Sequence, residues 1–206
     1  MTVAALYVET GGAYFGVAGV DAWDERRDAR TYPGPYPIVA HPPCQQWGRY
    51  ACSHPILGSN YRRGEEDDCF ARALDAVRTY GGVIEHPAQS RAWPAHGLGK
   101  PDSHGGWTDP DFWGGCSAHV EQGHYGHFSR KPTWLYVVSR AALPELIWGP
   151  AEQRLPAYAV QRYGYAKARR IGVMAAVGGG RKTQIRNATP AAFRDLLIGI
   201  AEAAGE

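Results

Sequence analysis

The sequence predicts an α/β fold: a mostly parallel sheet with an antiparallel hairpin at its edge, formed as a single domain over residues 1–206. Two patterns lead to this prediction. A strand–helix–strand unit occupies the first half of the chain, and two adjoining strand patterns follow further along. A chain of 206 residues can bury a core without disulfides or metals.

The strand–helix–strand unit has clear boundaries. Residues 37–40 are apolar and partly β-branched, and the two prolines that follow His41 stop the strand. Apolar residues recur at helical spacing over 66–80, and residues 83–85 form a second short strand. Because parallel strands joined by a helix end at the same edge of a sheet, Cys44 and Glu85 are expected to lie together.

The other expected elements surround this unit. Each is indicated by apolar periodicity, by Gly or Pro, or by a capping residue at its boundary. They are a strand at 4–9, a hairpin turn at Gly11 and Gly12 with a returning strand at 13–17, a charged surface helix at 23–32, a long loop with one turn of helix at 90–115, hairpin strands at 117–124 and 133–138, and a helix at 189–204 capped by Thr189.

Positive charge is concentrated late in the chain. The net charge is only +2, but residues 154–186 hold eight Lys or Arg residues, three tyrosines and no acidic residue. Cations interleaved with tyrosines suit a phosphate backbone with bases to stack on, although a solvated surface loop would have the same composition. We expect segment 150–188 to contact DNA, through Arg162, Lys167, Arg169, Arg170, Arg181 and Lys182.

Cys44 has the position of a nucleophile. It lies just past the carboxyl end of a predicted strand, where open α/β sheets place their ligands. The alternative is a buried, inert thiol that behaves as a small hydrophobic side chain. Glu85 has a similar alternative, as a strand-end carboxylate in a structural hydrogen-bond network.

Three segments occur in an order that resembles DNA cytosine-C5 methyltransferases, especially short, divergent phage-type members. Pro42-Pro43-Cys44-Gln45 is similar to the catalytic Pro-Pro-Cys-Gln of that family, and Ile84-Glu85-His86-Pro87 lies where the family has a Glu-Asn motif. Residues 122–131 resemble the later Gln-x-Arg-x-Arg region. The resemblance implies a reduced, Rossmann-like sheet of the methyltransferase type, with residues 37–140 as its catalytic core.

The resemblance also implies a chemistry. Cys44 would attack C6 of a flipped cytosine, and Glu85 would act at the N3 edge as a general acid with a raised pKa. Arg130 would orient the base or stabilise developing charge. The residues implied to bind the base or substrate are His41, Pro43, Gln45, His86, Gln122 and Lys131. Either histidine could also tune the thiolate.

The methyl-donor half of the site is shortened. The resemblance implies S-adenosylmethionine, with Glu9, Gly11, Gly12 and Asp21 as its binding residues and Asp24 and Glu25 as further acidic candidates. Only 29 residues, 13 to 41, separate Gly12 from Pro42, whereas one strand–helix–strand pass takes roughly 30 and the family order needs about two. At least one pass must be missing, so another one-carbon or small-group donor stays open.

Other function classes stay open as well. A catalytically silent relative could bind DNA as an antirestriction or regulatory module. A base-exchange or glycosidic-bond enzyme could use Glu85 or Asp21 as its acid or nucleophile. A zinc site could use Cys116, His119, His124 and His127, or Cys44, Cys52 and His54, but neither set has a standard zinc spacing, and we expect no metal.

The sequence also bears on the compartment. The four cysteines show no regular spacing, no signal peptide is apparent, and no apolar run has membrane-spanning length. These features favour a cytoplasmic protein that does not enter the membrane.

Overall fold

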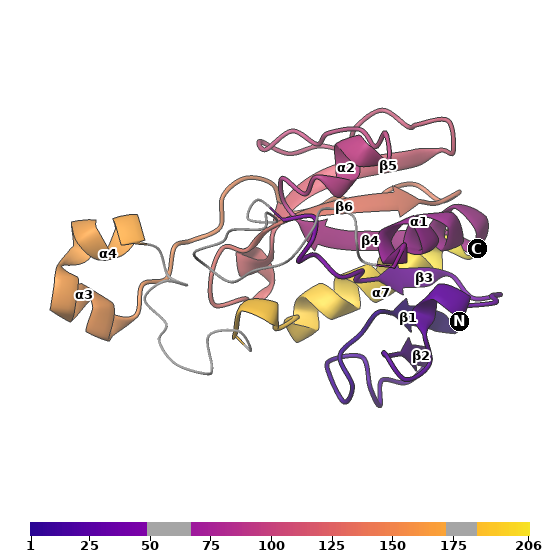
Figure 1. The fold of residues 1–206 in the computed structure, drawn as a ribbon. Helices are drawn as coiled ribbons and strands as arrows, with labels where there is room; N and C mark the ends of the chain where they lie inside the picture. The colour runs from indigo at the N-terminus through magenta and orange to yellow at the C-terminus, as the bar shows by residue number, and fades with distance from the viewer. Residues whose placement is uncertain (49–66, 172–184) are drawn as a thin grey trace.

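The fold is built on a six-stranded mixed sheet with strand order β2-β1-β3-β4-β6-β5. The computed structural model describes residues 1–48, 67–171 and 185–206. Strands β2, β1, β3 and β4 are parallel, and β6 runs antiparallel to both of its neighbours, so β6 and β5 form the antiparallel pair at one edge (Figure 1). The strands are β1 (Val3–Leu6), β2 (Val20–Trp23), β3 (Ile38–Ala40), β4 (Gly82–Pro87), β5 (Gly115–Glu121) and β6 (Pro132–Val138).

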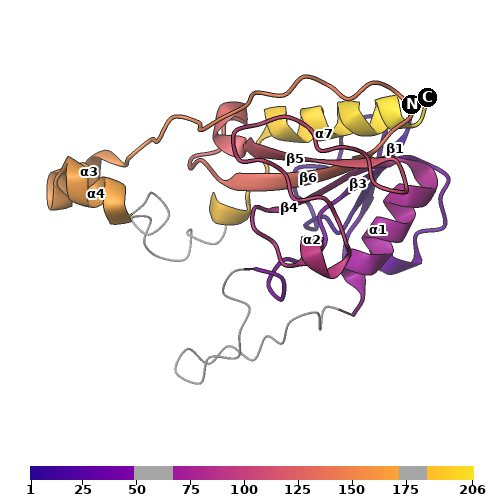
Figure 2. The ribbon, with the colours of Figure 1, turned by 90° about the horizontal axis from the view of Figure 1, so that it is seen from above.

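Helices cover both faces of the sheet. Figure 2 shows α1 and α2 on one face and α7 on the other, which makes an α/β/α arrangement. Helices α3 and α4 project away from the sheet. The α-helices are α1 (Cys69–Tyr80), α2 (Ala92–Ala95), α3 (Ala157–Tyr163), α4 (Tyr165–Ile171) and α7 (Ala191–Ala204), and the 3-10 helices are Ala29–Thr31 and Gln122–Tyr125.

The pleat of the strands divides the core into two layers. Alternate residues of a strand point to opposite faces, so Ile38, Ala40 and Ile84 pack under α1 and α2, while Val39 and Val83 pack under α7. The helices contribute apolar residues at helical spacing, among them Phe70 and Leu74 on one face and Phe193, Leu197 and Ile200 on the other. Both strands of the central parallel pair, β3 and β4, are therefore buried on both faces.

The expected strand–helix–strand unit is present as β3, α1 and β4, and β3 pairs in parallel with β4. The antiparallel edge pair is also confirmed, as is a single turn of helix, α2, within 90–115. Helix α7 begins at Ala191 with Pro190 as its N-cap, so the expected cap at Thr189 lies one residue too early.

Two expectations for the first 40 residues are wrong. Residues 13–17 form turns and no returning strand; the second strand is instead β2, parallel to β1. Tyr7 has a left-handed φ of 58°, which ends β1 before the glycines. The surface helix expected at 23–32 is reduced to the 3-10 turn Ala29–Thr31, because Trp23 is the last residue of β2.

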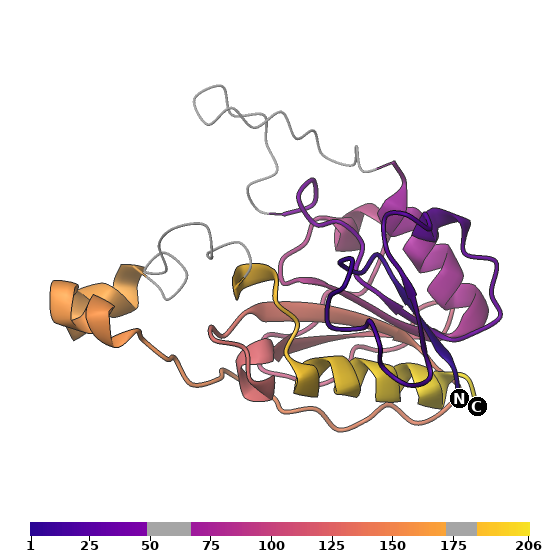
Figure 3. The ribbon, with the colours of Figure 1, turned by 90° about the horizontal axis from the view of Figure 1, so that it is seen from below.

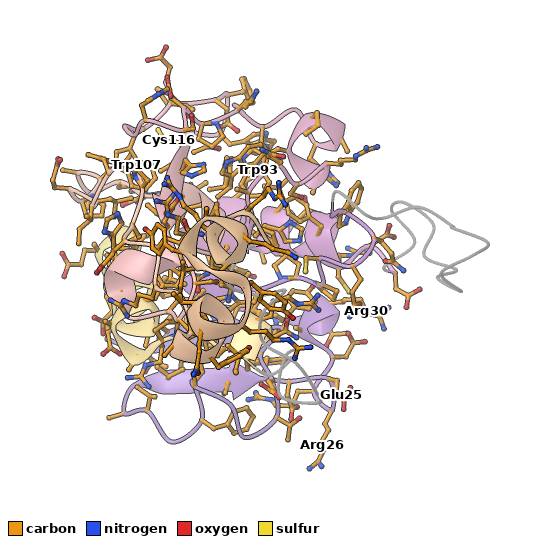
Figure 4. All side chains as sticks on the ribbon, turned by 90° about the vertical axis from the view of Figure 1, so that its left-hand side faces the viewer. Glu25, Arg26, Arg30, Trp93, Trp107 and Cys116 are labelled. Atoms are coloured by element: carbon orange, nitrogen blue, oxygen red, sulfur yellow. The ribbon has the colours of Figure 1, made fainter. Side chains whose placement is uncertain are left out.

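The carboxyl ends of the parallel strands face the projecting helices. In Figures 1 and 3 the α3–α4 pair lies beyond this edge, and the two chain termini lie side by side at the opposite edge. Figure 4 looks onto the carboxyl edge from the side of α3 and α4, with Glu25, Arg26 and Arg30 toward β2 and with Trp107 and Cys116 toward β5.

One glycine permits the close approach of β3 and β4. Gly82 has φ +125°, and a Cβ there would clash with the backbone of Ile38, its pairing partner in β3. Gly97, in the loop after α2, also has a positive φ of +67° but has open space around it. Comparing substitutions at the two positions therefore separates the cost of the positive φ from the cost of the clash between the two strands.

We predict that Gly82→Ala lowers the free energy of unfolding by about 4 kcal/mol or more, because the added carbon must push the two strands apart. Gly97→Ala should lose only about 1–2 kcal/mol, from the left-handed φ alone. Urea denaturation of both variants measures this difference. Equal losses at the two positions would show that the β3–β4 approach is not tightly constrained.

Candidate active site

The carboxyl edge of the parallel strands contains a topological switch point. From β1 the chain passes to β2 on one side and then to β3 on the other side. Ligands of open α/β sheets bind outside the strand ends at such a point. The loops that follow β1, β3 and β4 begin at this edge, so the predicted site residues Glu9, Cys44 and Glu85 lie near it.

The register of β3 and β4 places His41 beside Glu85. Val39 pairs with Val83 and Ala40 with Ile84, so His41 and Glu85 are the next residues of each strand. They share the face of the sheet that α7 covers, because they alternate with Ala40 and Ile84. His41 Nδ1 lies 2.9 Å from Glu85 Oε2.

A chain of hydrogen bonds extends from this pair in both directions. His41 Nε2 lies 2.8 Å from the Tyr14 hydroxyl, which comes from the β1–β2 loop. Glu85 Oε1 accepts a bond from Gln122 Nε2 at 3.1 Å, and the same amide nitrogen donates to Thr133 Oγ1 at 3.0 Å. These side chains thereby join the ends of β3, β4, β5 and β6. Tyr14, Gln122 and Thr133 are all buried.

Glu85 is held as a carboxylate. Burial raises its pKa, but the hydrogen bond and charge of His41 and the charge of Lys131 outweigh burial and lower the pKa to about 2. The expectation that Glu85 has a raised pKa is therefore wrong for the free protein. The strand register explains the difference, because it brings an imidazole N–H directly onto the carboxylate.

Cys44 lies at the start of a tight turn just past the carboxyl end of β3. Its carbonyl oxygen accepts bonds from the backbone N–H groups of Trp47 and Gly48, at 3.1 and 2.9 Å. Burial and the charge of Glu85 raise the pKa of the Cys44 thiol, while Arg186 and Lys131 lower it. The charge of the predicted acid thus acts on the predicted nucleophile, as expected if the strand–helix–strand unit brings the two strand ends together.

The charge of Lys131 lowers the pKa of both Glu85 and Cys44. Its backbone has a left-handed φ of 45°, which is unusual for a residue other than glycine, and its Nζ donates to the Ala188 carbonyl at 2.9 Å. Burial lowers its pKa, and the negative charge of Glu85 opposes that change.

Arg130 points to a different neighbour. Its Nε lies 3.7 Å from Glu121 Oε2 at the end of β5, and Glu121 also accepts a bond from the Ala151 N–H at 2.8 Å. Among the residues predicted from the 122–131 segment, the structure therefore brings Gln122 and Lys131 to Glu85 and Cys44, and it pairs Arg130 with Glu121 instead.

His86 has a supporting position. It points to the other face of the sheet from Glu85, where its ring packs against Phe70 and Trp93 and its Nδ1 lies 2.7 Å from Ser90 Oγ. Burial lowers its pKa to about 4, so the ring is neutral near pH 7. Its surroundings fit a structural role beneath the two prolines. Pro43 and Gln45 are exposed.

The predicted donor residues lie on the β1 and β2 side of the edge. Glu9 and Gly11 are exposed, and the Gly12 N–H closes a turn onto the Glu9 carbonyl at 2.8 Å. Asp21 is paired with Arg27 and accepts a bond from Trp23 Nε1 at 2.8 Å. The acidic residue that follows β2 is Asp24, which is buried and accepts a bond from Thr10 Oγ1 at 2.7 Å.

The predicted DNA-contacting residues are in part on the projecting helices. The exposed cations of α3 and α4 are Arg162, Lys167, Arg169 and Arg170. Arg162 and Lys167 both lie over the Tyr163 ring, at 5.3 and 5.5 Å from its centroid. Arg181 and Lys182 lie outside the described residues.

The two histidine and cysteine sets do not form a metal centre in the described parts of the chain. Over residues 1–48, 67–171 and 185–206, no group of three or more His, Cys, Asp or Glu could hold a metal ion. His119 accepts from Trp134 Nε1, His124 contacts the Gly149 carbonyl, and His127 lies between the carbonyls of Ser129 and Ile185. Cys52 and His54 lie outside the described residues.

Three residues of this site were not predicted as site residues. Tyr14 belongs to a glycine-rich loop whose path follows no periodic pattern, and Thr133 was assigned only to a strand. Arg186 was counted in the basic segment, yet it acts on the Cys44 thiol because the chain returns over this edge before α7 begins. For Thr133, the alternation of side chains along its strand could have indicated its position, because it places Thr133 on the α7 face with Leu135 and Val137.

Comparison with known proteins gives no family for this chain. No protein-family model matches it, and no curated protein matches it. Among the described helices, none is both long enough and apolar enough to cross a membrane.

We predict that Glu85 stabilises the folded protein at neutral pH and that this contribution to the free energy of unfolding is lost in acid. Its pKa in the folded protein, about 2, is below its ordinary value of 4.5, so its contribution is complete above pH 4.5 and is lost as the pH falls toward 2. Glu85→Gln should therefore cost up to about 3 kcal/mol at pH 7 and much less at pH 3. The free energy of unfolding of both proteins across this range measures the difference.

A second group titrates in the same range. Burial lowers the pKa of His86, which makes both proteins less stable in acid, and because the charge of Glu85 opposes that effect, the contribution of His86 works against the expected fall in cost. A cost of Glu85→Gln that does not change between pH 7 and pH 3 would contradict the ionised state of Glu85.

Proposed function

We propose that this protein covalently modifies a pyrimidine base in DNA, with cytosine C5 as the target, by adding the Cys44 sulfur to C6 of the base. One observation carries the proposal: at the carboxyl edge of the sheet, the thiol of a cysteine is influenced by the charge of a carboxylate that is itself held by a histidine and a glutamine. The ordered resemblance to cytosine-C5 methyltransferases supports the choice of base, and the mixed sheet is compatible with the methyltransferase-type fold that the resemblance implies.

The ionised Glu85 suits a two-stage role in the addition. As the S–C6 bond forms, the C5=C6 electron pair moves to C4–C5 and the C4=N3 pair accepts a proton at N3. The proton that N3 gains is the one that the thiol loses. Glu85 takes this proton from sulfur as a base and returns it at N3 as an acid, so no proton is gained or lost overall.

Two cations favour the thiolate that this step needs. Lys131 and Arg186 both lower the pKa of Cys44 against the effects of burial and of Glu85. We assign to them the charge-stabilising role that the resemblance implied for Arg130, because Arg130 is paired with Glu121. The strained backbone of Lys131 is consistent with a position fixed for function.

The projecting helices support DNA as the substrate. The α3–α4 pair carries exposed cations and aromatic rings and lies beyond the same edge as Cys44 (Figure 2). Cations of this kind bind phosphates without regard to sequence. A base inside a duplex hides its C6 face in the stack, so DNA held here would have to present a flipped or single-stranded base to the edge.

The predicted S-adenosylmethionine residues do not fit that donor well. Within residues 1–48, the Gly11–Gly12 turn is followed by turns and not by a helix. The carboxylates of Asp21 and Asp24 are both occupied by neighbours in the same segment. The proposal therefore stops at the covalent addition, and the donor of the one-carbon or small group is left undefined.

A donor-independent exchange reaction tests the proposal. Reversible addition of sulfur to C6 makes C5 able to take up a proton from solvent. In D₂O, the protein should therefore place deuterium at C5 of cytosine in DNA without any donor, and Cys44→Ala should abolish it. Cys116→Ala, at the start of β5, is the matched control and should retain exchange. Mass spectrometry of the digested nucleosides gives the readout.

The other outcomes identify the competing functions. DNA binding without deuterium incorporation would contradict the addition and favour a silent DNA-binding protein. Loss or replacement of whole bases in the same digest would favour a glycosidic-bond enzyme. Exchange that persists in Cys44→Ala would overturn the assignment of the nucleophile.

A further inference from the structure

Tyr14 is a buried, titratable group of the site that the proposed chemistry does not yet use. It is 3% exposed, and it comes from the loop after β1, where turn residues and glycines predominate. Its hydroxyl lies 2.8 Å from His41 Nε2, and the two rings are 5.3 Å apart. The bond crosses the switch point between β1 and β3, so it joins the two halves of the parallel sheet.

The charge of Glu85 determines which way this bond runs. An ionised carboxylate can only accept, so the His41 atom that faces it, Nδ1, must carry the hydrogen. When His41 is neutral, its other nitrogen, Nε2, is an acceptor, so the Tyr14 hydroxyl is the donor; when His41 is protonated, both nitrogens donate and the hydroxyl accepts. The Tyr14 bond therefore selects one tautomer of the neutral ring.

We propose that Tyr14 is a positioning residue that fixes His41 in the Nδ1–H tautomer, so that the proton moved during base addition stays on Glu85. This inference rests on the proposed function, because it concerns the proton that passes from the Cys44 sulfur to N3 of the base. With Nε2 already occupied by the Tyr14 hydroxyl, that proton has no route onto the histidine. His41 keeps its Nδ1–H bond to Glu85 Oε2 while Glu85 receives the proton and releases it.

The surroundings of Tyr14 agree with a donor role. Burial and the nearby negative charge of Glu85 raise the pKa of Tyr14 well above its ordinary value, so the hydroxyl keeps its hydrogen. The loop that carries Tyr14 is held from the other side by Arg194 at the start of α7, whose Nη1 donates to the Ala13 carbonyl at 2.9 Å. Strand β3 and helix α7 therefore fix the hydroxyl from two directions.

The test is Tyr14→Phe, which keeps the ring and removes the hydroxyl. Tyr125→Phe is the matched control: Tyr125 is another tyrosine on the α7 face, its hydroxyl accepts a bond from the Ile147 N–H at 3.2 Å, and it packs on Phe193. Nitrogen-15 NMR of histidine-labelled protein at alkaline pH reports the tautomer of His41. We expect a pure Nδ1–H signal in the wild type and in Tyr125→Phe, and a mixture of tautomers in Tyr14→Phe.

The exchange reaction supplies a second readout. Tyr14→Phe should lower the maximal rate of C5 deuteration about tenfold or more, as removal of a partner of a functional histidine does, with the KM for DNA unchanged. An unchanged His41 tautomer in Tyr14→Phe would overturn the inference, and so would a changed tautomer with an unchanged rate. Absence of exchange in the wild type would instead contradict the proposed function, while the NMR result would still report on Tyr14.

Discussion

The pairing of β3 with β4 is the constraint on which the rest of the site depends. The two strands are three and six residues long, and their register continues past their last pair to set His41 beside Glu85. The prolines after His41 then end β3 and turn the chain so that Cys44 lies beside the same carboxylate. A shift of one residue would send Glu85 to the α1 face, where His86 now packs against Phe70 and Trp93.

The electrostatics of the site follow from what this register brings together. Burial alone would neutralise Glu85, but a histidine N–H and a lysine oppose it and keep the carboxylate charged. The charged carboxylate in turn raises the pKa of the Cys44 thiol, which Lys131 and Arg186 lower. The resting site therefore holds an ionised carboxylate beside a protonated thiol. Under the proposed function, this pairing would pass a proton from sulfur to the bound base.

Local patterns were sufficient to predict the central unit and its two principal residues. The apolar run before two prolines, the helical spacing of Phe70, Leu74 and Val77, and the short strand after Gly81 each have a direct physical meaning, and parallel pairing requires their ends to meet. The first 40 residues were harder to predict. A strand that ends in a left-handed Tyr7 and a parallel β2 reached without a helix leave no periodic signal.

The partners of the site were predictable only in part, because they are set by tertiary contacts. Gln122 and Lys131 were chosen from a motif and do lie at the edge. The neighbouring Arg130 turns to Glu121 because the end of β5 offers a carboxylate there. Tyr14 and Arg186 come from segments far apart in the sequence, and only the packing of the β1–β2 loop and of the chain before α7 brings them to His41 and Cys44.

The most direct test of the central claim is capture of the covalent adduct itself. A DNA oligonucleotide in which one cytosine is replaced by 2-pyrimidinone, which is more electrophilic at C6, should trap the addition without any donor. Intact-protein mass spectrometry should show the mass of one protein plus one oligonucleotide, and peptide mapping should place the bond on Cys44. Absence of an adduct under conditions where the DNA is bound, or an adduct on any other residue, would contradict the account.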